Sequence, residues 1–341
     1  MPTTKKHILV IRLSAMGDVA MVVPVLRALT TQHQNLQITV LTRKFFEPFF
    51  RNLPNVSVLE ADVKNTHKGI FGLFKLAKTI RQIGITQIAD LHNVLRSNIL
   101  KCFLFDKPFR QINKGRKEKK QLTSGQIFKQ LKTTHQRYAD VFTALGYTID
   151  LSNPTFEPKA ELSTELQQLI GFSSDKKLIG IAPFATHQGK MYDINQMEKV
   201  IEELAKENQV ILFGGGKKET EILNEIQEKL TNLISVAGKI NLHQELDIIS
   251  NLDVMLSMDS GNAHIATMFG INVVTIWNVT HPYAGFYPFA QPETNALLAD
   301  RNQYPKIPTS IYGNKFPEGY ENAVSKTVTP EMIVEKIKSV I

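Results

Sequence analysis

Short apolar, β-branched runs alternate with segments of helical periodicity along the whole chain. The first run, His7–Leu13, is followed by a loop and by apolar residues at helical spacing over Val19–Leu29, which predicts a strand, a loop and a helix. Further strands are predicted at Gln37–Leu41, Val56–Glu60, Gln87–Asp90, Leu178–Ala182, Val210–Phe213, Val254–Met258 and Val273–Ile276. Helical patterns separate them, at Phe71–Ile83, Asn195–Lys206, Glu219–Leu230, Leu242–Asn251 and Gly261–Phe269, and a last one covers Pro330–Ile341. Such alternation is typical of parallel sheets.

A stretch of different composition, Leu151–Pro158, interrupts this alternation with Ser, Asn and two prolines, and we place a linker there. The chain has 341 residues, of which 43% are hydrophobic. That exceeds what a single core usually holds, so two domains are expected. The predicted fold class is α/β, with two doubly wound domains that face a central cleft. In open α/β sheets the ligand lies beyond the carboxyl ends of the strands, so the loops after the strands are the candidate site.

Cellular placement is predicted from what the sequence lacks. Cys102 is the single cysteine, the first residues do not have the order of a secretory signal, and no apolar run is long enough to span a bilayer. We therefore expect a cytoplasmic protein without a transmembrane segment.

The charged residues are unevenly distributed along the chain. The formal net charge is +8, from 40 basic and 32 acidic residues, and Lys101–Asp140 holds eleven Lys or Arg against three acids. The segment Lys101–Lys132 is either a solvated loop or a contact with an acceptor or an anionic membrane surface. Aromatic residues that could stack on exposed bases do not interleave with these cations, so nucleic acid is not an expected partner.

The loop after the first strand, Ser14–Asp18, contains Gly17, which permits a tight turn, and Asp18 at the start of a helix. An aspartate there is either a helix cap or a general base, and the sequence alone favours the cap because capping aspartates are far commoner.

Two loops of the second half have the residue types of an anion site. Met258–His264 is a small-residue turn that opens a helix, where free backbone N–H groups and the helix dipole favour a group such as a diphosphate. Its alternative is an ordinary turn capped by Asp259 or Ser260. The loop Ala182–Lys190 ends in Lys190, which could reach a phosphate or be solvated. Gly214–Gly216 is a further close-approach turn.

The sequence lacks the motifs of metal sites, dinucleotide-binding enzymes and serine hydrolases. No His, Cys, Asp and Glu set has metal-ligand spacing, and neither Gly-x-Gly-x-x-Gly after the first strand nor Gly-x-Ser-x-Gly is present. We expect no metal and no cofactor. His92 and Arg96 follow the strand Gln87–Asp90 and are candidate acceptor contacts, although His92 is equally well explained as a structural residue.

Taken together, the loops Ser14–Asp18, Thr186–Lys190 and Asp259-Ser260-Gly261-x-x-His264 resemble glycosyltransferase family 9, the ADP-heptose:lipopolysaccharide heptosyltransferases. The resemblance covers nearly the whole chain and implies the GT-B fold, with two Rossmann-like domains. It implies an acceptor-side domain over residues 1–155, a nucleotide-sugar-binding domain over 156–328, and a terminal helix over 329–341 that packs back on the first domain.

The resemblance also implies roles for individual residues. Asp18 matches the catalytic base and Lys190 the donor-phosphate lysine. The donor contacts, including the close-approach glycines, are expected at Arg12, Thr186, Lys190, Gly214, Gly215, Ile240, Asp259, Ser260, Gly261 and His264. The acceptor-side residues are expected at Ser14, Met16, Gly17, His92 and Arg96.

The implied function is inverting transfer of a heptose from an ADP-activated donor to a lipopolysaccharide inner-core glycolipid, at or near the cytoplasmic face of the inner membrane. Two alternatives remain: a GT-B enzyme with another nucleotide sugar or with a capsule, O-antigen or protein acceptor, and a noncatalytic protein that binds sugar nucleotides. The presence of Asp18, Lys190 and Asp259 argues against the noncatalytic alternative.

Overall fold

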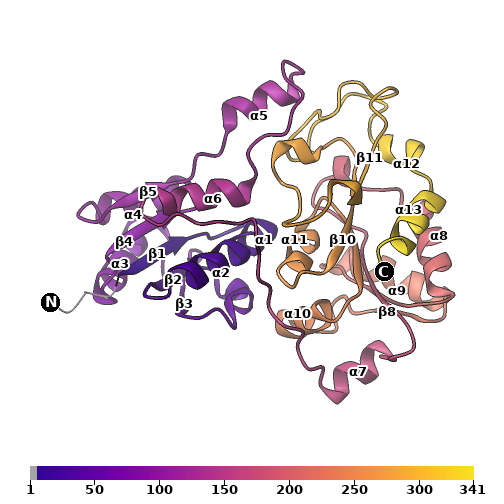
Figure 1. The fold of residues 1–341 in the computed structure, drawn as a ribbon, viewed down its shortest axis with the longest axis horizontal. Helices are drawn as coiled ribbons and strands as arrows, with labels where there is room; N and C mark the ends of the chain where they lie inside the picture. The colour runs from indigo at the N-terminus through magenta and orange to yellow at the C-terminus, as the bar shows by residue number, and fades with distance from the viewer. Residues whose placement is uncertain (1–5) are drawn as a thin grey trace. The chain divides into compact units, whose positions relative to one another are not determined.

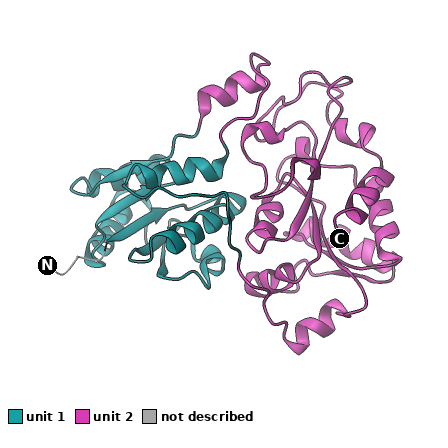
Figure 2. Cartoon of the chain, viewed as in Figure 1, with its two compact units in different colours: residues 1–114, 133–156 teal, residues 115–132, 157–341 magenta. Residues whose placement is uncertain are grey.

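The computed structural model describes residues 6–341 and divides the chain into two compact units. Unit 1 comprises the residues up to Lys114 together with Thr133–Phe156, and unit 2 comprises Gly115–Lys132 together with Glu157–Ile341 (Figure 2). The chain passes between the units three times, and the last passage, between Phe156 and Glu157, lies at the predicted linker. The segment Gly115–Lys132 departs from the predicted division, because it belongs to unit 2 although it interrupts the sequence of unit 1. Residues 1–5 of the predicted first domain lie outside the described range.

Unit 1 is built on a five-stranded parallel sheet in the order β3-β2-β1-β4-β5. Its strands are β1 (His7–Ile11), β2 (Gln37–Thr42), β3 (Val56–Glu60), β4 (Gln87–Asp90) and β5 (Phe109–Gln111). Its helices are α1 (Met16–Ala20), α2 (Val22–Gln32), the 3-10 helix η1 (Lys44–Phe50), α3 (Gly69–Gln82), α4 (Leu95–Phe103) and α6 (Thr134–Thr143) (Figure 1).

Apart from His7, the central strand of unit 1 consists of apolar residues. All five residues of β1 are buried, as expected for a parallel strand with both faces covered. On α3, Leu73, Leu76 and Ile80 recur at helical spacing and pack into the same core as Leu9 and Ile11 of β1. The periodicity read from the sequence therefore corresponds to a helix face packed on the sheet.

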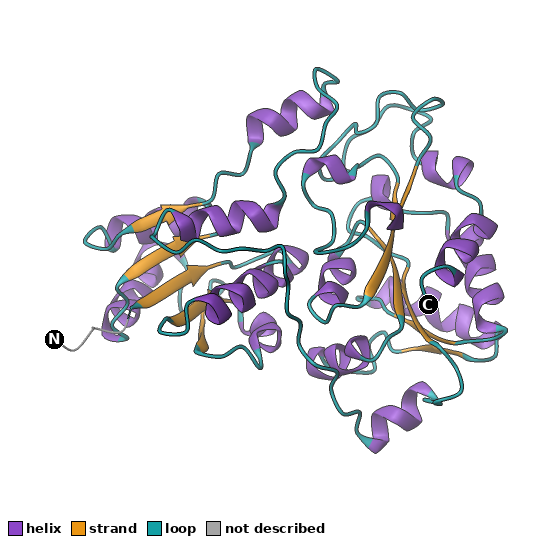
Figure 3. Cartoon of the chain, in the orientation of Figure 1, coloured by secondary structure: helices purple, strands orange, loops and turns teal. Residues whose placement is uncertain are grey.

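Unit 2 is built on a six-stranded parallel sheet in the order β11-β10-β9-β6-β7-β8. Its strands are β6 (Leu178–Ala182), β7 (Gln209–Leu212), β8 (Leu233–Ser235), β9 (Val254–Met258), β10 (Asn272–Trp277) and β11 (Ala296–Leu298). Its helices are α5 (Arg116–Thr123), α7 (Thr164–Ile170), η2 (Gln188–Lys190), α8 (Ile194–Ala205), α9 (Lys217–Lys229), α10 (Leu242–Ser250), α11 (Gly261–Thr267), η3 (Pro282–Ala284), η4 (Glu293–Asn295), α12 (Ala323–Thr327) and α13 (Pro330–Lys338) (Figure 3).

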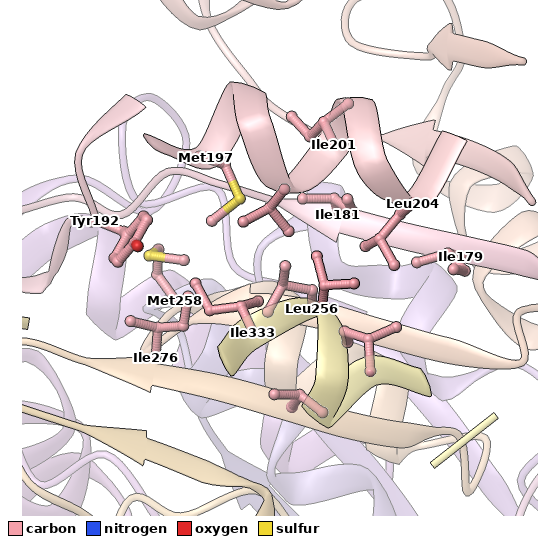
Figure 4. Packing of buried hydrophobic residues seen from close by; sticks show 14 of the residues in the cluster. Ile179, Ile181, Tyr192, Met197, Ile201, Leu204, Leu256, Met258, Ile276 and Ile333 are labelled. Atoms are coloured by element: carbon pink, nitrogen blue, oxygen red, sulfur yellow. The ribbon is translucent and has the colours of Figure 1, made fainter. Parts of the chain in front are cut away.

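The terminal helix α13 belongs to the core of unit 2. Its buried residues Ile333, Val334 and Ile337 join the cluster that also contains Ile181 of β6 and Met197 of α8. Figure 4 shows Ile333 among the side chains of β6, α8 and β9. The resemblance implied that this helix packs on the first domain, whereas its described apolar contacts are with unit 2.

The strands that the sequence patterns did not predict are β5, β8 and β11. Each has three residues and lies at an edge of its sheet. A run of three residues is too short to show a period, and an edge strand does not need to be apolar on both faces.

No helix of the described chain is both long enough and apolar enough to cross a membrane.

Candidate active site

The loop after β1 holds an ion pair between two of the predicted residues. Arg12 is buried and its Nη2 lies 2.6 Å from Oδ2 of Asp18, which is partly exposed. The guanidinium Nη1 also donates to the Leu91 carbonyl at 2.7 Å, and the group lies 5.9 Å from the centre of the Tyr138 ring. A buried cation requires such partners, since an unpaired charge away from water is costly.

Asp18 lies in the first turn of α1 and makes two polar contacts through one carboxylate oxygen. Its Oδ2 accepts a hydrogen bond from the Ala15 N–H at 3.3 Å, which is a contact at the start of α1, and the same oxygen faces Arg12. The Tyr138 hydroxyl donates to the Asp18 backbone carbonyl at 3.2 Å. Within the described residues, both polar contacts of the carboxylate are made by Oδ2 and none by Oδ1.

The loop after β4 is bonded to the loop after β1. The buried Asp90 accepts from the N–H groups of His92 and Asn93 through Oδ1, at 2.9 and 2.8 Å. His92 Nδ1 in turn accepts from the Leu13 N–H at 3.4 Å. Desolvation by burial, and then the charge of Arg12, lower the pKa of His92 to about 4. The imidazole is therefore neutral at pH 7 and connects two loops that are far apart in sequence.

The remaining acceptor-side candidates are placed less tightly. Ser14, Met16 and Gly17 are partly buried in the loop after β1 and the first turn of α1, and Arg96 is exposed in the first turn of α4. The structure thus brings Ser14, Met16 and Gly17 next to Asp18 along the chain, whereas Arg96 makes no described hydrogen bond or ion pair with it.

Unit 2 has a second ion pair, at the carboxyl ends of the neighbouring strands β6 and β9. Lys190 Nζ lies 2.8 Å from Oδ2 of Asp259, with side-chain exposures of 17% and 5%. Gly189 positions the lysine, because its N–H donates to the Gly313 carbonyl at 3.1 Å and its carbonyl accepts from the Val279 N–H at 3.0 Å. A Cβ at Gly189 would collide with the Gly313 carbonyl, so this close approach requires glycine.

The predicted anion loop is not capped by its own side chains. Ser260 is the N-cap of α11 with extended backbone but makes no side-chain capping bond, and its hydroxyl lies 3.0 Å from that of Ser257. The Asp259 carboxylate faces Lys190. Ser260 and Gly261 are partly exposed, and His264 is buried in the first turn of α11. Ser260 is therefore the cap of α11 by position, but neither its side chain nor that of Asp259 makes a described capping hydrogen bond.

The other predicted donor contacts lie in separate loops of unit 2. Thr186 is exposed and Ile240 is half-buried, and no described hydrogen bond joins either to Lys190 or Asp259. After β7, the Gly215 N–H donates to Oε2 of Glu219 at 2.8 Å. Gly214 lies beside Leu223, because a Cβ at Gly214 would lie only 2.8 Å from the Cδ1 atom of Leu223.

Several contacts were missed by the sequence patterns. Tyr138, Leu91 and Gly313 support the two ion pairs from distant parts of the chain, and no local motif marks them. Glu219 has a local signal, since an acid in the first turn of a helix commonly pairs with free N–H groups. Among residues 6–341, no three His, Cys, Asp or Glu side chains gather closely enough to hold a metal ion.

The sequence model of glycosyltransferase family 9 (heptosyltransferase) matches residues 73–314. The chain belongs to this family. It is therefore a glycosyltransferase, as the loops predicted.

Similar proteins agree with this assignment. The chain is 27% identical over 294 residues to the lipopolysaccharide core heptosyltransferase OpsX of Haemophilus influenzae, covering 81% of this chain and 80% of that protein. The crystal structure of a family 9 glycosyltransferase from Veillonella parvula superposes with a TM-score of 0.77 at 18% identity, covering 100% and 98% of the two chains. The structure of the E. coli heptosyltransferase WaaC with ADP-2-deoxy-2-fluoro heptose gives 0.65 at 15% identity, covering 98% and 99%. The predicted α/β fold class of the GT-B type is confirmed.

The neutral His92 predicts a pH dependence of stability. Its folded pKa of about 4 lies below the ordinary value of 6.5, so the unfolded chain binds more protons between these values. The stabilisation is present above pH 6.5 and is lost as the pH falls towards 4. Burial also lowers the pKa of His7 and His281, but both are present in wild type and variant alike.

Between pH 7.5 and pH 5, the free energy of unfolding should therefore fall by about 1–2 kcal/mol less in His92→Gln than in wild type. Urea unfolding followed by circular dichroism measures this difference. A variant with the full wild-type pH dependence would show that His92 is not held neutral.

Proposed function

We propose that this glycosyltransferase transfers a heptose from an ADP-activated donor, with inversion, to a hydroxyl of a lipopolysaccharide inner-core glycolipid. The observation that carries the proposal is that each unit has a cation–carboxylate pair at the carboxyl end of its central strands, Arg12–Asp18 after β1 and Lys190–Asp259 after β6 and β9. The structure of E. coli WaaC with ADP-2-deoxy-2-fluoro heptose supports the donor class, and the similarity to the lipopolysaccharide core heptosyltransferase of H. influenzae supports the acceptor class.

Asp18 is the general base in the proposed reaction. Its Oδ1, which has no described protein contact, takes the proton of the acceptor hydroxyl as that oxygen attacks the anomeric carbon of the donor. The bond from the anomeric carbon to the diphosphate oxygen breaks on the opposite face, and ADP leaves with the electron pair. Arg12 holds Oδ2 at 2.6 Å and thereby orients the carboxylate.

Lys190 stabilises the leaving diphosphate in the same scheme. Its ammonium is largely buried, where a charge interacts more strongly than in water. The backbone N–H groups of Ser260 and Gly261 would add to this, so the scheme needs no metal ion. Thr186, Gly214, Ile240 and His264 remain proposed donor contacts. A phosphate bound at Gly215 would have to displace the Glu219 carboxylate from its N–H.

The same contacts bear on the alternative functions of the chain. A different nucleotide sugar, or a capsule, O-antigen or protein acceptor, would use the same base and lysine, so only ligand measurements separate these. A noncatalytic sugar-nucleotide binder would have no use for a carboxylate with one oxygen oriented by a buried arginine and the other free of described contacts. The arrangement thus fits the glycosyltransferase activity of the family to which the chain belongs.

Nucleotide selectivity tests the donor. In isothermal titration calorimetry, ADP should bind at least about tenfold more tightly than UDP or GDP. Lys190→Ala should weaken ADP binding by about 10- to 100-fold because a charge-assisted contact is lost. Lys199→Ala, an exposed lysine on α8, is the matched control and should bind ADP as wild type does. Preference for UDP or GDP would reject the ADP-activated donor, and unchanged ADP binding by Lys190→Ala would remove Lys190 from the donor site.

Asp18→Asn tests the base. Turnover with ADP-heptose and a lipopolysaccharide inner-core acceptor should fall by about 10²- to 10⁴-fold, because proton removal is lost, whereas ADP affinity should stay within about twofold since the residue does not hold the nucleotide. Asp106→Asn, which breaks a surface ion pair with Arg81, should keep near-normal turnover. Near-normal turnover by Asp18→Asn would reject the base assignment.

We also propose peripheral contact with an anionic membrane surface. The segment Lys101–Lys132, where the sequence suggested it, is divided between the two units after Lys114. A clearer surface is the exposed face of α3 in unit 1, where Ile70, Phe71 and Phe74 are 62%, 91% and 47% exposed. Helix α3 contains no acid, and Lys78 Nζ lies 5.0 Å from the centre of the Phe74 ring. Exposed apolar side chains beside lysines are typical of interfacial helices.

Phe71→Ser tests this surface in a sedimentation assay with vesicles of phosphatidylglycerol and phosphatidylcholine. Binding should weaken by about tenfold, because an aromatic side chain no longer enters the interface, and pure phosphatidylcholine vesicles should bind wild type poorly. Phe172→Ser, an exposed phenylalanine of unit 2, is the control. Equal binding by Phe71→Ser and wild type would reject the α3 surface.

A further inference from the structure

A cavity of about 590 Å³ lies within unit 2, and its walls come from two distant parts of the chain. One wall is the end of α5 and the turn after it, which belong to the segment Gly115–Lys132. The other wall is the loop that follows β11. The lining residues are Leu122, Thr123, Ser124, Gly125, Phe128, Arg301, Pro305, Lys306, Ile307, Thr309, Lys315, Phe316 and Pro317. None of the candidate active-site residues is among them.

The charges of this cavity are all positive. Arg301, Lys306 and Lys315 line it, and no lining residue is acidic. Within the described part of the chain, no ion pair joins any of these three cations to a carboxylate. Cations gathered without acids raise the local concentration of anions, so the ligand that fits is negatively charged.

Arg301 is held in place by the walls. Its Nε donates to the Ile307 carbonyl at 2.8 Å, and its guanidinium carbon lies 3.4 Å from the centre of the Phe128 ring. The Phe128 ring also meets the His281 ring, with the two centres 5.0 Å apart. Burial, and then the charge of Arg301, lower the pKa of His281 to about 4, so this neighbour adds no charge at pH 7. Such a fixed guanidinium loses little side-chain freedom when it binds an anion.

The rest of the lining suits a saccharide. The lining includes the apolar side chains of Phe128, Phe316 and Pro317 together with the hydroxyls of Thr123, Ser124 and Thr309. Mixed apolar faces and polar groups that fix orientation are usual in small-molecule sites of this size. A simple inorganic anion would use only the cations and leave these walls without contacts.

We propose that this cavity binds a phosphate or carboxylate group carried by a sugar of the acceptor glycan, with Arg301, Lys306 and Lys315 as its anion contacts. The assignment of the ligand to the acceptor rests on the transferase function proposed above. The cavity is a binding subsite, and the reacting groups remain Asp18 and Lys190.

Direct binding tests the cavity independently of turnover. Glucose 6-phosphate serves as the phosphorylated sugar, glucose as its neutral match and inorganic phosphate as the bare anion, all titrated into the intact chain at low salt. Glucose 6-phosphate should bind at least about tenfold more tightly than either of the others. Inorganic phosphate that binds as tightly as glucose 6-phosphate, or no binding of glucose 6-phosphate at all, would overturn the proposal.

The double variant Lys306→Gln/Lys315→Gln should weaken glucose 6-phosphate binding by about tenfold or more, because two charge-assisted contacts are lost. The control Lys326→Gln/Lys336→Gln removes the same charge from α12 and α13, outside the cavity, and should bind as wild type does. Equal loss in both double variants would assign the effect to net charge and reject the cavity.

Ser124→Trp fills the cavity without removing a cation, and should also abolish glucose 6-phosphate binding while the melting temperature stays near that of wild type. ADP affinity separates this proposal from the proposed function. It should be unchanged in all three variants, and a parallel loss of ADP binding in Lys306→Gln/Lys315→Gln would assign the cavity to the donor instead. A wild-type chain that binds glucose 6-phosphate but not ADP would reject the donor and leave the cavity in place.

Discussion

The parallel hydrogen-bonding register of neighbouring strands is the constraint on which both candidate sites depend. Ile11 of β1 pairs with Asp90 of β4, and Ala182 of β6 pairs with Ser257 of β9. Because parallel neighbours run the same way, the loops that leave their carboxyl ends emerge together. The Leu13–His92 hydrogen bond in unit 1 and the Lys190–Asp259 ion pair in unit 2 are the direct results. Parallel pairing of neighbouring strands thus brings polar side chains together in each unit.

Electrostatics then decides what these constellations can do. Arg12 and Lys190 are largely withdrawn from water, and each is paired with a carboxylate and supported by backbone groups from distant loops. Removing one partner from such a pair leaves a charge without compensation, which costs much more than a surface ion pair is worth. The pairs therefore hold their side chains in defined positions before any ligand arrives, which is the preorganisation that transfer chemistry requires.

The positive charge of the chain has a structural distribution that its sequence does not reveal. One contiguous basic stretch in sequence is divided between two units. Its second part forms an uncharged wall of a cavity, and the three cations of that cavity all come from the loop after β11. The lysines of α3 instead accompany exposed aromatic residues. The cations of these segments thus lie on separate surfaces, which the net charge of +8 alone does not distinguish.

The sequence by itself determined the buried strands, the main helices and the loops that carry Asp18, Lys190 and Asp259, because burial on both faces of a parallel sheet and packing of one helix face each impose a local period. It did not reveal the three-residue edge strands, which are too short for a period. Only the tertiary structure decided that Gly115–Lys132 and α13 belong to unit 2, that Arg12 pairs with Asp18 and Lys190 with Asp259, and that Arg301, Lys306 and Lys315 share a cavity. The physical reason is that contacts between residues distant in sequence depend on how the packed elements fill space, and no local pattern encodes their partners.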